Sequence, residues 1–429
     1  MSETEPDNIE RRARGGRSKF DGRREQLIVV ATRILNRRGV RAMTLAEVAK
    51  AAGMVTTNVA YYFGKKEALA AACFVSGLER LEQLVAAASA EPTARARLTH
   101  LWRAYFALST KIARGEEPQI PIFSDIRTLA EPLHSEVNGR YGEYTQAVRD
   151  LLRAPDLAWL RGKAAAARVN IIQEQLNWTA AWLPRFEVSD YPRLCERMLD
   201  ILFEGLATAN APWPAKPMLA AAEISPEPGG APDAFLIAAT RQINEHGYKG
   251  ASVNRIAAAL KRTKGAFYHH LASKDDLVVA GFERTFRISR DVQSAALALD
   301  DCPWRRLHAA VTGLLAFQLS PEGPLMRTSA LQSLPEPMRV RMVRHSNRIA
   351  DRFAGMVSDG VAAGDLRAVD PLVAAQMLTS SINAAADVPL YDPQTRPEDA
   401  VRRYATPILK GLFAHSQKTP AGEKDILAH

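Results

Sequence analysis

Polar and aromatic side chains that could contact DNA are concentrated in one short run of the chain, MVTTNVAYYF, between Gly53 and Gly64. Hydroxyl and amide groups can hydrogen-bond to base edges, and aromatic edges can contact thymine methyl groups or phosphates. The residues of this run that could do so are Thr56, Thr57, Asn58, Tyr61 and Tyr62. Each could equally be an ordinary solvated residue, so the prediction depends on the elements that position them.

Two short helices joined by a tight turn are predicted to carry these residues. Thr44-Leu45-Ala46-Glu47 has the pattern of a capping box, in which Thr44 begins a helix, and Gly53 ends that helix about two turns later. A further helix is expected over residues 56–62, and Gly64 separates it from another that begins near Lys66. Helix, tight turn and helix form the helix-turn-helix pattern, whose second helix lies in a DNA major groove. The helix N-terminus that Thr44 caps could face a phosphate.

A longer helix is predicted before these two, because apolar residues keep helical spacing from Leu27 to Leu35. It closes with Arg37-Arg38-Gly39, which places positive charge at the negative end of a helix and then a residue that tolerates a left-handed backbone. A flexible basic arm is expected in front of it, built from Arg11, Arg12, Arg14, Arg17 and Lys19. Such an arm could follow phosphates or enter a minor groove, or it could be a solubilising tail.

The whole segment returns in degraded form 208 positions later, where residues 229–277 repeat residues 21–69 without gaps. Ala31-Thr32-Arg33 falls on Ala239-Thr240-Arg241, for example. A spacing of roughly 200 residues is a domain length, so two similar domains are joined end to end. The second copy has Lys261 where the first has Gly53, and a left-handed backbone there would cost about 1 kcal/mol.

The run TLAEVAKAAGMVTTNVAYYFGKKEAL resembles the DNA-binding head of the tetracycline-repressor (TetR) family, and SVNRIAAALKRTKGAFYHHLASKDDL is similar to it as well. The resemblance covers only these two heads. It implies an all-α fold of two TetR-like units in tandem, each with a helix-turn-helix head and a helical body. Family members bind DNA as two-fold dimers and release it when a small molecule enters the domain behind the head.

The resemblance also implies further DNA contacts. In the second copy these are expected at Lys264, Gly265, Tyr268 and His270. Lys66 and Lys274 begin a helix at the position where the family touches phosphate, and Ser252 corresponds to the capping Thr44. The first copy departs from the family in having Ala60 where a Tyr is usual. It also has Val55 where a Ser or Thr cap is usual, so Thr56 could cap one residue later.

Positive charge is concentrated on the two heads. The net charge of the chain is +9, but residues 11–66 hold fourteen Lys/Arg against three carboxylates, and residues 231–274 hold seven against two. The remainder of the chain is therefore acidic. This distribution fits phosphate binding by the heads.

Helices are expected in both bodies, since no alternating β pattern of useful length competes. In the first body they cover residues 68–90, 98–114, 133–153, 159–183 and 191–208; in the second they cover residues 304–319, 338–363, 370–386 and 397–413. A Pro-broken segment interrupts each body, at residues 118–132 and 321–335. The resemblance makes the last two helices of each body its dimer face.

The expected divisions are a basic arm (1–20), head 1 (21–69), body 1 (70–209), a linker (210–232), head 2 (233–277), body 2 (278–415) and a tail (416–429). The linker holds six of the 25 prolines of the chain and should be extended. At about 3.1 Å per residue it reaches up to roughly 70 Å. Half-sites one helical turn apart need about 34–36 Å, so the two copies could form an internal pseudo-dimer.

A ligand pocket behind each head is implied by the resemblance, and large apolar side chains could line it. The candidates are Trp102, Tyr105, Phe106 and Phe123 in the first body and Trp304, Phe317, Met326 and Met342 in the second. Each of them taken singly is more typical of plain core.

Several other classes of protein are disfavoured. The acidic start of the chain is unlike a secretory signal, and no run of 18 apolar residues could span a membrane. Cys73, Cys195 and Cys302 are isolated, which favours a reduced bacterial cytoplasm. Adjacent His269 and His270 lie on different helix faces with no third ligand nearby, so no metal is expected. No catalytic set stands at recognisable spacing, so neither an enzyme nor a cofactor is predicted.

The favoured hypothesis is a ligand-responsive transcriptional regulator, a repressor, whose fused halves read a double-stranded operator with unequal half-sites. In one alternative only head 1 reads DNA, and the second half serves dimerisation or ligand sensing. In another the protein is a small-molecule sensor or scaffold without operator specificity. Pairing of two fused chains into a further homodimer stays open, and so does the identity of the small-molecule effector.

Overall fold

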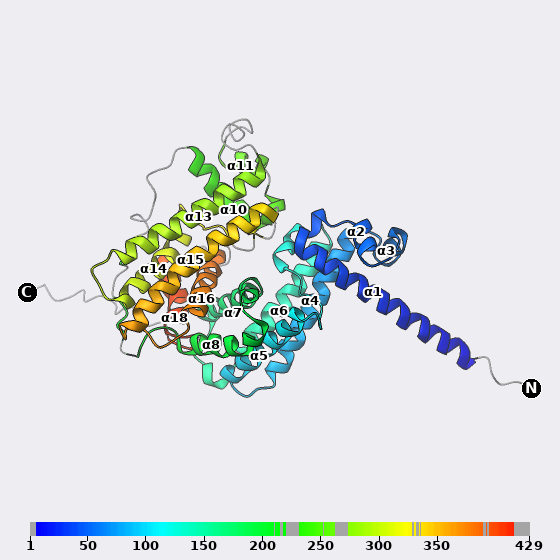
Figure 1. Cartoon of the computed structure of the whole chain (residues 1–429), viewed down its shortest axis with the longest axis horizontal. Coiled ribbons are helices and arrows are strands. Elements are labelled where there is room, and N and C mark those ends of the chain that lie inside the picture. The colour runs from blue at the N-terminus through cyan, green and yellow to red at the C-terminus, as the bar shows by residue number, and fades with distance from the viewer. Residues whose placement is uncertain are drawn as a thin grey trace, which may run out of the picture. The chain divides into compact units, whose positions relative to one another are not determined.

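A computed structural model describes residues 6–209, 211–214, 218–219, 231–251, 253–261, 273–327, 330–331, 334, 336–388, 392 and 394–415 (Figure 1). Within these ranges the regular elements are helices, and the one β-type contact is an isolated bridge between Ala207 and Leu366. The prediction of an all-α fold is confirmed. No helix among the described residues is long and apolar enough to cross a membrane.

The chain divides into two compact units that do not coincide with the two sequence copies. One unit is Met1–Gln83 with Arg114–Tyr144, and the other is Leu84–Ala113 with Thr145–His429. The second unit therefore holds part of the first body together with the described part of the second copy.

The first unit is built around head 1. Its core joins apolar side chains of the head to Ile126, Leu129 and Val137 from the segment that follows the Pro-rich stretch. The helices that begin in this unit are α1 (Pro6–Ala42), α2 (Leu45–Ala51), α3 (Thr56–Phe63), α4 (Lys66–Ser89), the short 3-10 helix η1 (Phe123–Thr128) and α6 (Leu133–Leu151).

Helix α1 is really two helices, because Gly39 has φ 71° and ψ 167° and changes the direction of the chain. Gly247, the matching residue of the second copy, has φ 71° and ψ 164°. The prediction that Gly39 ends the first helix is thus confirmed, and the repeat reproduces the turn. Residues 6–19, which we expected to be a flexible arm, continue α1 as a helix. Arg, Glu and Ala favour helix there, and Gly15 and Gly16 oppose it by only about 1 kcal/mol each.

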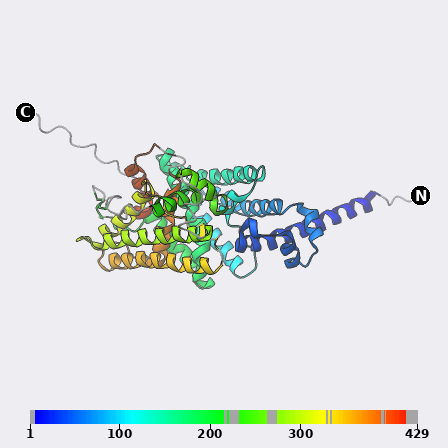
Figure 2. The same ribbon diagram turned by 90° about the horizontal axis from the view of Figure 1, so that it is seen from above.

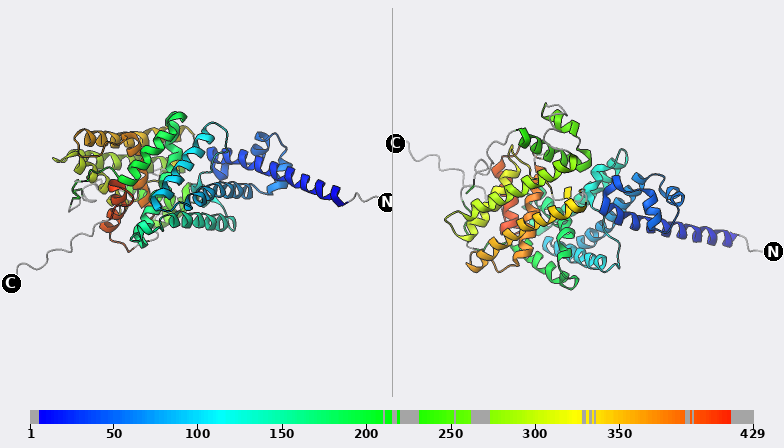
Figure 3. Two further views of the ribbon diagram at one scale, coloured as in Figure 1. Left: turned by 90° about the horizontal axis from the view of Figure 1, so that it is seen from below. Right: turned by 45° about the horizontal axis from the view of Figure 1, so that its top comes forward.

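The second unit is a larger bundle. Its helices are α5 (Ala94–Ala113), α7 (Gly162–Trp182), α8 (Tyr191–Glu204), α10 (Ala231–Gly250), α11 (Val253–Ala259), α13 (Lys274–Leu297), α14 (Pro303–Gln318), α15 (Glu336–Ala362), α16 (Pro371–Ala384) and α18 (Pro397–Lys410). Helices α13 and α15 run alongside one another, as the green-yellow and orange ribbons show (Figures 2 and 3). Helix α16 packs against α15 on one side and against α7 on the other. The helices expected in both bodies are therefore present, with ends that differ by a few residues.

One described part of the linker, residues 211–214, lies against the second body. The indole Nε1 of Trp304 donates a hydrogen bond of 2.8 Å to the Pro212 carbonyl. The Trp213 ring meets the ring of His308 edge to face, with centroids 4.5 Å apart. This end of the linker is thus anchored on α14. Of the other linker residues, 218–219 and 231–232 are described, and the tail from Ser416 lies outside the described residues.

Candidate nucleic-acid interface and ligand cavity

Thr44 caps helix α2 as the sequence predicts. Its Oγ1 accepts a hydrogen bond of 3.2 Å from the Glu47 backbone N–H, and the Glu47 carboxylate pairs with Arg38 at 3.4 Å. Gly53 has φ 67°, and the next residue, Met54, donates from its backbone N–H to the Ala49 carbonyl. The tight turn between the two helices therefore depends on a left-handed residue.

Helix α3 presents an exposed polar face. Thr56, Thr57, Asn58 and Tyr61 are exposed, whereas Val59 is fully buried in the core of the unit. Thr57, Asn58 and Tyr61 stand at helical spacing and share one face. The suggestion that Thr56 caps this helix is wrong, because the helix begins at Thr56 itself, with Val55 in the capping position and no side-chain cap.

An aromatic cluster supports this face from α1. The Phe20 ring lies 4.6 Å from the Tyr62 ring and 6.1 Å from the Tyr61 ring, measured between centroids. Tyr61 is 76% exposed, while Tyr62 is half-buried and packs against the core. Tyr61 is therefore free to meet a partner, and Tyr62 positions it. Sequence reasoning missed Phe20, whose only signal is an aromatic residue in the basic segment before the head.

Lys66 begins α4 as expected, but its side chain is already used. The ammonium donates a 2.6 Å hydrogen bond to the Arg41 carbonyl at the end of α1. An ammonium has three donors, so this contact orients Lys66 and leaves donors for a phosphate.

The second head is described only in part. Of the DNA contacts expected there, only Lys274 is described, and it begins α13. The others lie outside the described residues; they are Ser252, Lys264, Gly265, Tyr268 and His270. Lys261 has φ 52°, so this position is left-handed and the cost considered for a lysine there applies. Ser273 caps α13 by accepting from the Asp276 N–H at 3.1 Å. The SKDD sequence carries that capping signal, which sequence reasoning did not use.

Within the second unit, helices α7 and α8 of the first copy pack against α16 and α18 of the second. The ends of α8 and α18 meet backbone to backbone: the Leu206 N–H donates to the Leu409 carbonyl at 2.9 Å, and the Leu412 N–H donates to the Leu202 carbonyl at 2.7 Å. Gly205 lies at this crossing, where a Cβ would come within 2.4 Å of the Gly411 nitrogen.

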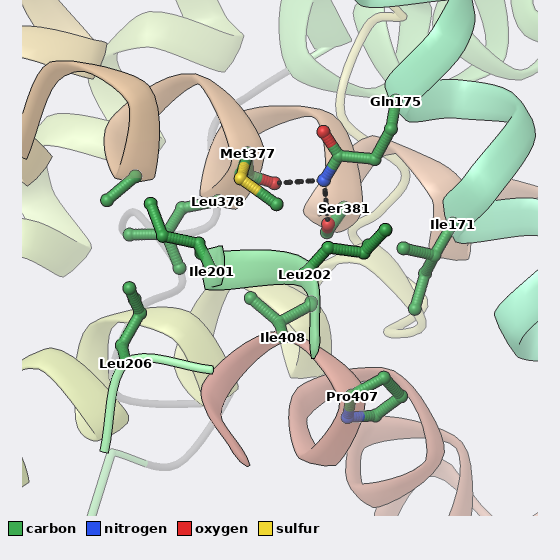
Figure 4. A pocket seen from close by; sticks show the side chains of 11 residues that line it. Ile171, Gln175, Ile201, Leu202, Leu206, Met377, Leu378, Ser381, Pro407 and Ile408 are labelled. Carbon is green, nitrogen blue, oxygen red and sulfur yellow. Dashed lines mark hydrogen bonds between the residues drawn. The ribbon is translucent and has the colours of Figure 1, made fainter. Parts of the chain in front are cut away.

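Buried polar contacts fix the register of these helices. Gln175 donates to the Met377 carbonyl at 3.0 Å and to the Ser381 hydroxyl at 2.8 Å, beside a small apolar hollow (Figure 4). Trp178 donates to Gln376 at 3.0 Å. Ion pairs that join the two copies include Arg197 with Asp370, Arg367 with Asp200 at 2.7 Å, and Lys163 with the buried Asp392 at 2.7 Å.

Arg168 on α7 holds the end of the second copy. Its fully buried guanidinium donates two hydrogen bonds of 2.6 Å, one to the Leu412 carbonyl and one to the Ala414 carbonyl. The Trp159 ring stacks on His415 with centroids 3.8 Å apart. Side chains of the first copy thus anchor the residues that follow α18.

The aromatic residues of the first body that we expected to line a pocket are buried or half-buried, and each already has a partner. Trp102 donates to the Met198 sulfur at 3.3 Å, Tyr105 donates to the Leu176 carbonyl at 2.9 Å, and Phe106 is 2% exposed. Phe123 belongs to the first unit, where it packs against Phe74. That these residues contact a ligand stays a prediction.

A small cavity of about 40 Å³ lies in the second body. Its walls come from α13, α14, α15 and α16, with Phe282 and Phe286 on α13 and Phe353 on α15. Of the predicted lining residues of this body, Met326 lines the cavity; Trp304, Phe317 and Met342 are buried but are not part of its described wall. Sequence reasoning missed the two Phe residues of α13, although their i, i+4 spacing marks an apolar helix face.

No group of three His, Cys, Asp or Glu side chains that could hold a metal ion occurs in the described part of the chain. Burial raises the pKa of the Cys195 thiol to about 12, and burial likewise raises that of Cys73 to about 12. Both thiols are therefore protonated and unreactive.

Comparison with known families gives two matches to a head model and one match to a body model. A family model described as "Bacterial regulatory proteins, tetR family" matches residues 27–73 and again residues 235–280. A second, described as "Tetracyclin repressor-like, C-terminal domain", matches residues 300–387.

Among individual proteins, the chain is similar to the transcriptional repressor AcnR of Corynebacterium efficiens, with 29% identity over 124 residues, which is 27% of this chain and 65% of that protein. It is also similar to the regulator BetI of Rhizobium meliloti, with 38% identity over 85 residues, 20% of this chain and 42% of that protein. The chain thus spans less than two thirds of the length of each. Among solved structures, the TetR family regulator PfmR of Thermus thermophilus has 25% identity and a TM-score of 0.36, covering 42% of this chain and 98% of that one.

Proposed function

We propose that the chain, which is a tandem TetR-type helix-turn-helix transcriptional regulator, represses transcription by binding an operator with its two fused heads. It dissociates from the operator when a small molecule binds. The observation that carries this proposal is the exposed polar face of α3, on the second helix of a helix-turn-helix, in a head that occurs twice in one chain. Its place of action would be the bacterial cytoplasm.

Head 1 offers both kinds of DNA contact. Thr57 and Asn58 on α3 are short, exposed and polar, which suits hydrogen bonds to base edges in a major groove. Tyr61 extends from the same face toward a thymine methyl group or a phosphate. Lys66, oriented by the Arg41 carbonyl, would contact phosphate at the start of α4.

The two heads would act as one clamp through an internal pseudo-dimer. The packing of α7 and α8 against α16 and α18, with the backbone contact between Leu206 and Leu409, supports this arrangement. Covalent linkage makes the second head's contact intramolecular, with an effective concentration in the millimolar range. Because the expected recognition sequences of the two heads differ, TTNVAYY against TKGAFYHH, the operator should have unequal half-sites.

The cavity of the second body gives a route for regulation. Its walls include α13, which starts at the end of head 2, and α16, which packs against α7 of the first copy. A ligand that changes how these two helices pack would change the position of head 2 relative to α7. Such a ligand weakens DNA binding only if it binds the DNA-free arrangement more tightly.

Selection of bound oligonucleotides followed by footprinting tests the central claim. We expect one site with two different halves, and affinity for it that exceeds affinity for random DNA at every salt concentration. Asn58→Ala should weaken specific binding by about 1–3 kcal/mol and relax selectivity at one base pair. The matched control is Asn138→Ala, an exposed residue of α6 outside the head, which should change nothing. If the affinities for random and for selected DNA fell equally as salt increased, the protein would instead be a sensor or scaffold without operator specificity.

One observation favours a second candidate, in which head 1 alone reads DNA. Lys261 holds a left-handed backbone that glycine holds in head 1, so head 2 carries a strain that head 1 lacks. In that case Lys264→Ala combined with Lys274→Ala would leave DNA affinity unchanged, and the footprint would be a perfect palindrome read by two chains.

A further inference from the structure

The first helix of each head is joined to the segment behind the head by one asparagine side chain. In the first copy, the Asn36 Nδ2 donates a hydrogen bond of 2.9 Å to the Ile120 carbonyl, and its Oδ1 accepts one of 3.0 Å from the Ile122 N–H. A side-chain amide has the same donor and acceptor as a peptide group. Asn36 therefore pairs with residues 120–122 much as a neighbouring strand would.

The second copy makes the same contact with the same atoms. Asn244 lies 208 positions after Asn36, which is the offset of the sequence repeat. Its Nδ2 donates to the Leu325 carbonyl at 2.8 Å, and its Oδ1 accepts from the Arg327 N–H at 3.0 Å. Each asparagine thus binds the carbonyl of one residue and the N–H of the residue two positions later. We call each asparagine with its three-residue stretch, 120–122 or 325–327, a latch.

The middle residue of each stretch lies against a glycine of the helix that follows the head. In the first copy this residue is Pro121, and a Cβ on Gly77 of α4 would lie 2.3 Å from its ring. In the second it is Met326, and a Cβ on Gly281 of α13 would lie 2.5 Å from its Cε. Each stretch is therefore packed between two helices, and a first helix bonded to it is held at a fixed point.

Both asparagines stand where they can fix the direction of the head. Asn36 precedes Gly39 by three residues, and Asn244 precedes Gly247 by three. Both glycines have φ 71° and turn the chain from the first helix into the helix-turn-helix. The apolar core that the head shares with the segment behind it is non-directional, whereas hydrogen bonds have a preferred geometry. The apolar contacts hold the head in place, and the latch sets its angle.

We propose that Asn36 and Asn244 are positioning residues that set the orientation of each head on the segment behind it. The orientation itself can be measured without DNA. Its consequence for operator binding rests on the proposed function.

The two latches differ in strength. In head 2, Arg241 of α10 also donates to the Gly323 carbonyl at 3.1 Å and to the Pro321 carbonyl. Its counterpart in head 1, Arg33, is exposed and makes no hydrogen bond or ion pair with the part of the chain that the structure describes. Loss of the asparagine should therefore free head 1 more than head 2.

Distances between pairs of spin labels on the full-length chain measure the orientation of each head. Lys50→Cys on α2 and Glu143→Cys on α6 place labels at exposed positions for head 1. Ala258→Cys on α11 and Asp359→Cys on α15 do the same for head 2. The exposed native Cys302 is replaced by Ser, and the two buried cysteines stay. The parent should give one narrow distance distribution for each head.

Asn36→Asp separates hydrogen bonding from size. The carboxylate has nearly the volume of the amide, but it cannot donate to the Ile120 carbonyl and faces that oxygen with a negative charge. Asn36→Asp and Asn36→Ala should both broaden the distribution of head 1 and leave that of head 2 unchanged. Asn244→Asp should broaden head 2 only slightly, and combining it with Arg241→Ala should broaden head 2 as much as Asn36→Asp broadens head 1.

Two control variants separate orientation from charge and from stability. Asn138→Asp makes the same chemical change at an exposed position of α6 and should leave both distributions narrow. Thr32→Val removes a hydroxyl that donates to the Ile28 carbonyl at 2.8 Å within the first helix, so it destabilises that helix without touching the latch. It should lower the unfolding temperature and keep the distribution of head 1 narrow.

Operators whose half-sites are moved apart or together by one base pair provide the functional readout. The parent should bind one spacing best. Asn36→Asp should bind that operator about tenfold more weakly if about a tenth of its molecules hold head 1 at the right angle. It should also discriminate less between spacings, whereas Thr32→Val should keep the preference of the parent.

Unchanged head 1 distributions in both Asn36 variants, or equal broadening in Thr32→Val, would overturn the inference. If a head 1 variant loses helical content in circular dichroism, the head 2 variants decide by the same criterion. A head 1 that broadens without any change in operator binding would support the positioning role and count against the proposed clamp. A parent that ignores operator DNA would count against the proposed function alone.

Discussion

At the scale of single residues, Lys261 has a backbone conformation that is unfavourable for a residue with a side chain. It holds φ 52°, a conformation that costs an L-residue about 1 kcal/mol and costs glycine almost nothing. Lys261→Gly should therefore stabilise head 2 by about 1 kcal/mol, as measured by the hydrogen-exchange protection of α10 and α11.

Two matched variants separate this backbone effect from the loss of the lysine charge. Lys261→Ala removes the charge but keeps Cβ, and it should not stabilise head 2. Gly53→Lys makes the reverse change in head 1 and should destabilise it by a similar amount, since Gly53 has φ 67°. Equal stabilisation by Ala and Gly at position 261 would disprove the backbone explanation.

His308 predicts a pH effect on stability. The pKa of its ring is lowered to about 4, mainly by burial and further by the positive charges of Arg305 and Lys410. The unfolded ring has a pKa of 6.5, so between these values the unfolded chain takes up a proton that the folded chain does not. Stability is therefore lost as pH falls from about 6.5 to about 4.

His308→Phe should remove this dependence and relieve two buried ring nitrogens that have no partner among the described residues. In urea unfolding, we expect the stability difference between variant and parent to grow by about 2 kcal/mol from about pH 7.5 to about pH 5. A difference that stays constant with pH would show that His308 does not titrate on unfolding.

At the scale of elements, Arg168 of the first copy is one of the residues that hold the segment after α18. Arg168 donates to two carbonyls of the segment after α18, so Arg168→Ala leaves both without this donor. We expect the free energy of unfolding of the second unit to fall by about 3 kcal/mol in a denaturant titration. Arg168→Lys should rescue little, because an ammonium cannot reproduce the two-pronged contact.

The exposed Arg193 on α8 provides the control for that experiment. It has no hydrogen bond or ion pair among the described residues, so Arg193→Ala should change stability by less than about 0.5 kcal/mol. Similar losses in the two variants would mean that arginine charge, rather than the contact with α18, is responsible.

Local features of these elements could be predicted from sequence, whereas contacts between distant residues could not. The Thr44 cap and the left-handed turn at Lys261 follow from the residues beside them. The pairing of Arg168 with the Leu412 carbonyl joins residues 244 positions apart and uses a backbone group that has no sequence signal. The residues that line a pocket could not be predicted in this way. Tyr105 is aromatic and faces apolar residues, but its hydroxyl donates a hydrogen bond to the Leu176 carbonyl. Aromatic type alone does not distinguish a cavity wall from a packed core.

At the scale of the whole molecule, the internal packing predicts stoichiometry. The faces of α7 and α8 that could pair with another chain are covered by α16 and α18. We therefore expect light scattering to give the mass of one chain, 47.1 kDa, at micromolar concentration, and one chain per operator in the DNA complex. A mass of twice that value, or two chains on each operator, would show that fused chains pair again.

The Arg168 contact has a consequence for how this protein can change over time. In an assembly of two identical chains every substitution is present twice, so a harmful change is felt at both symmetric positions. Here Arg168 meets carbonyls of Leu412 and Ala414, and each mutation occurs once. Substitutions in one half can then change the DNA sequence that it binds while the other half keeps its original sequence preference. Two identical chains of a homodimer cannot change separately in this way.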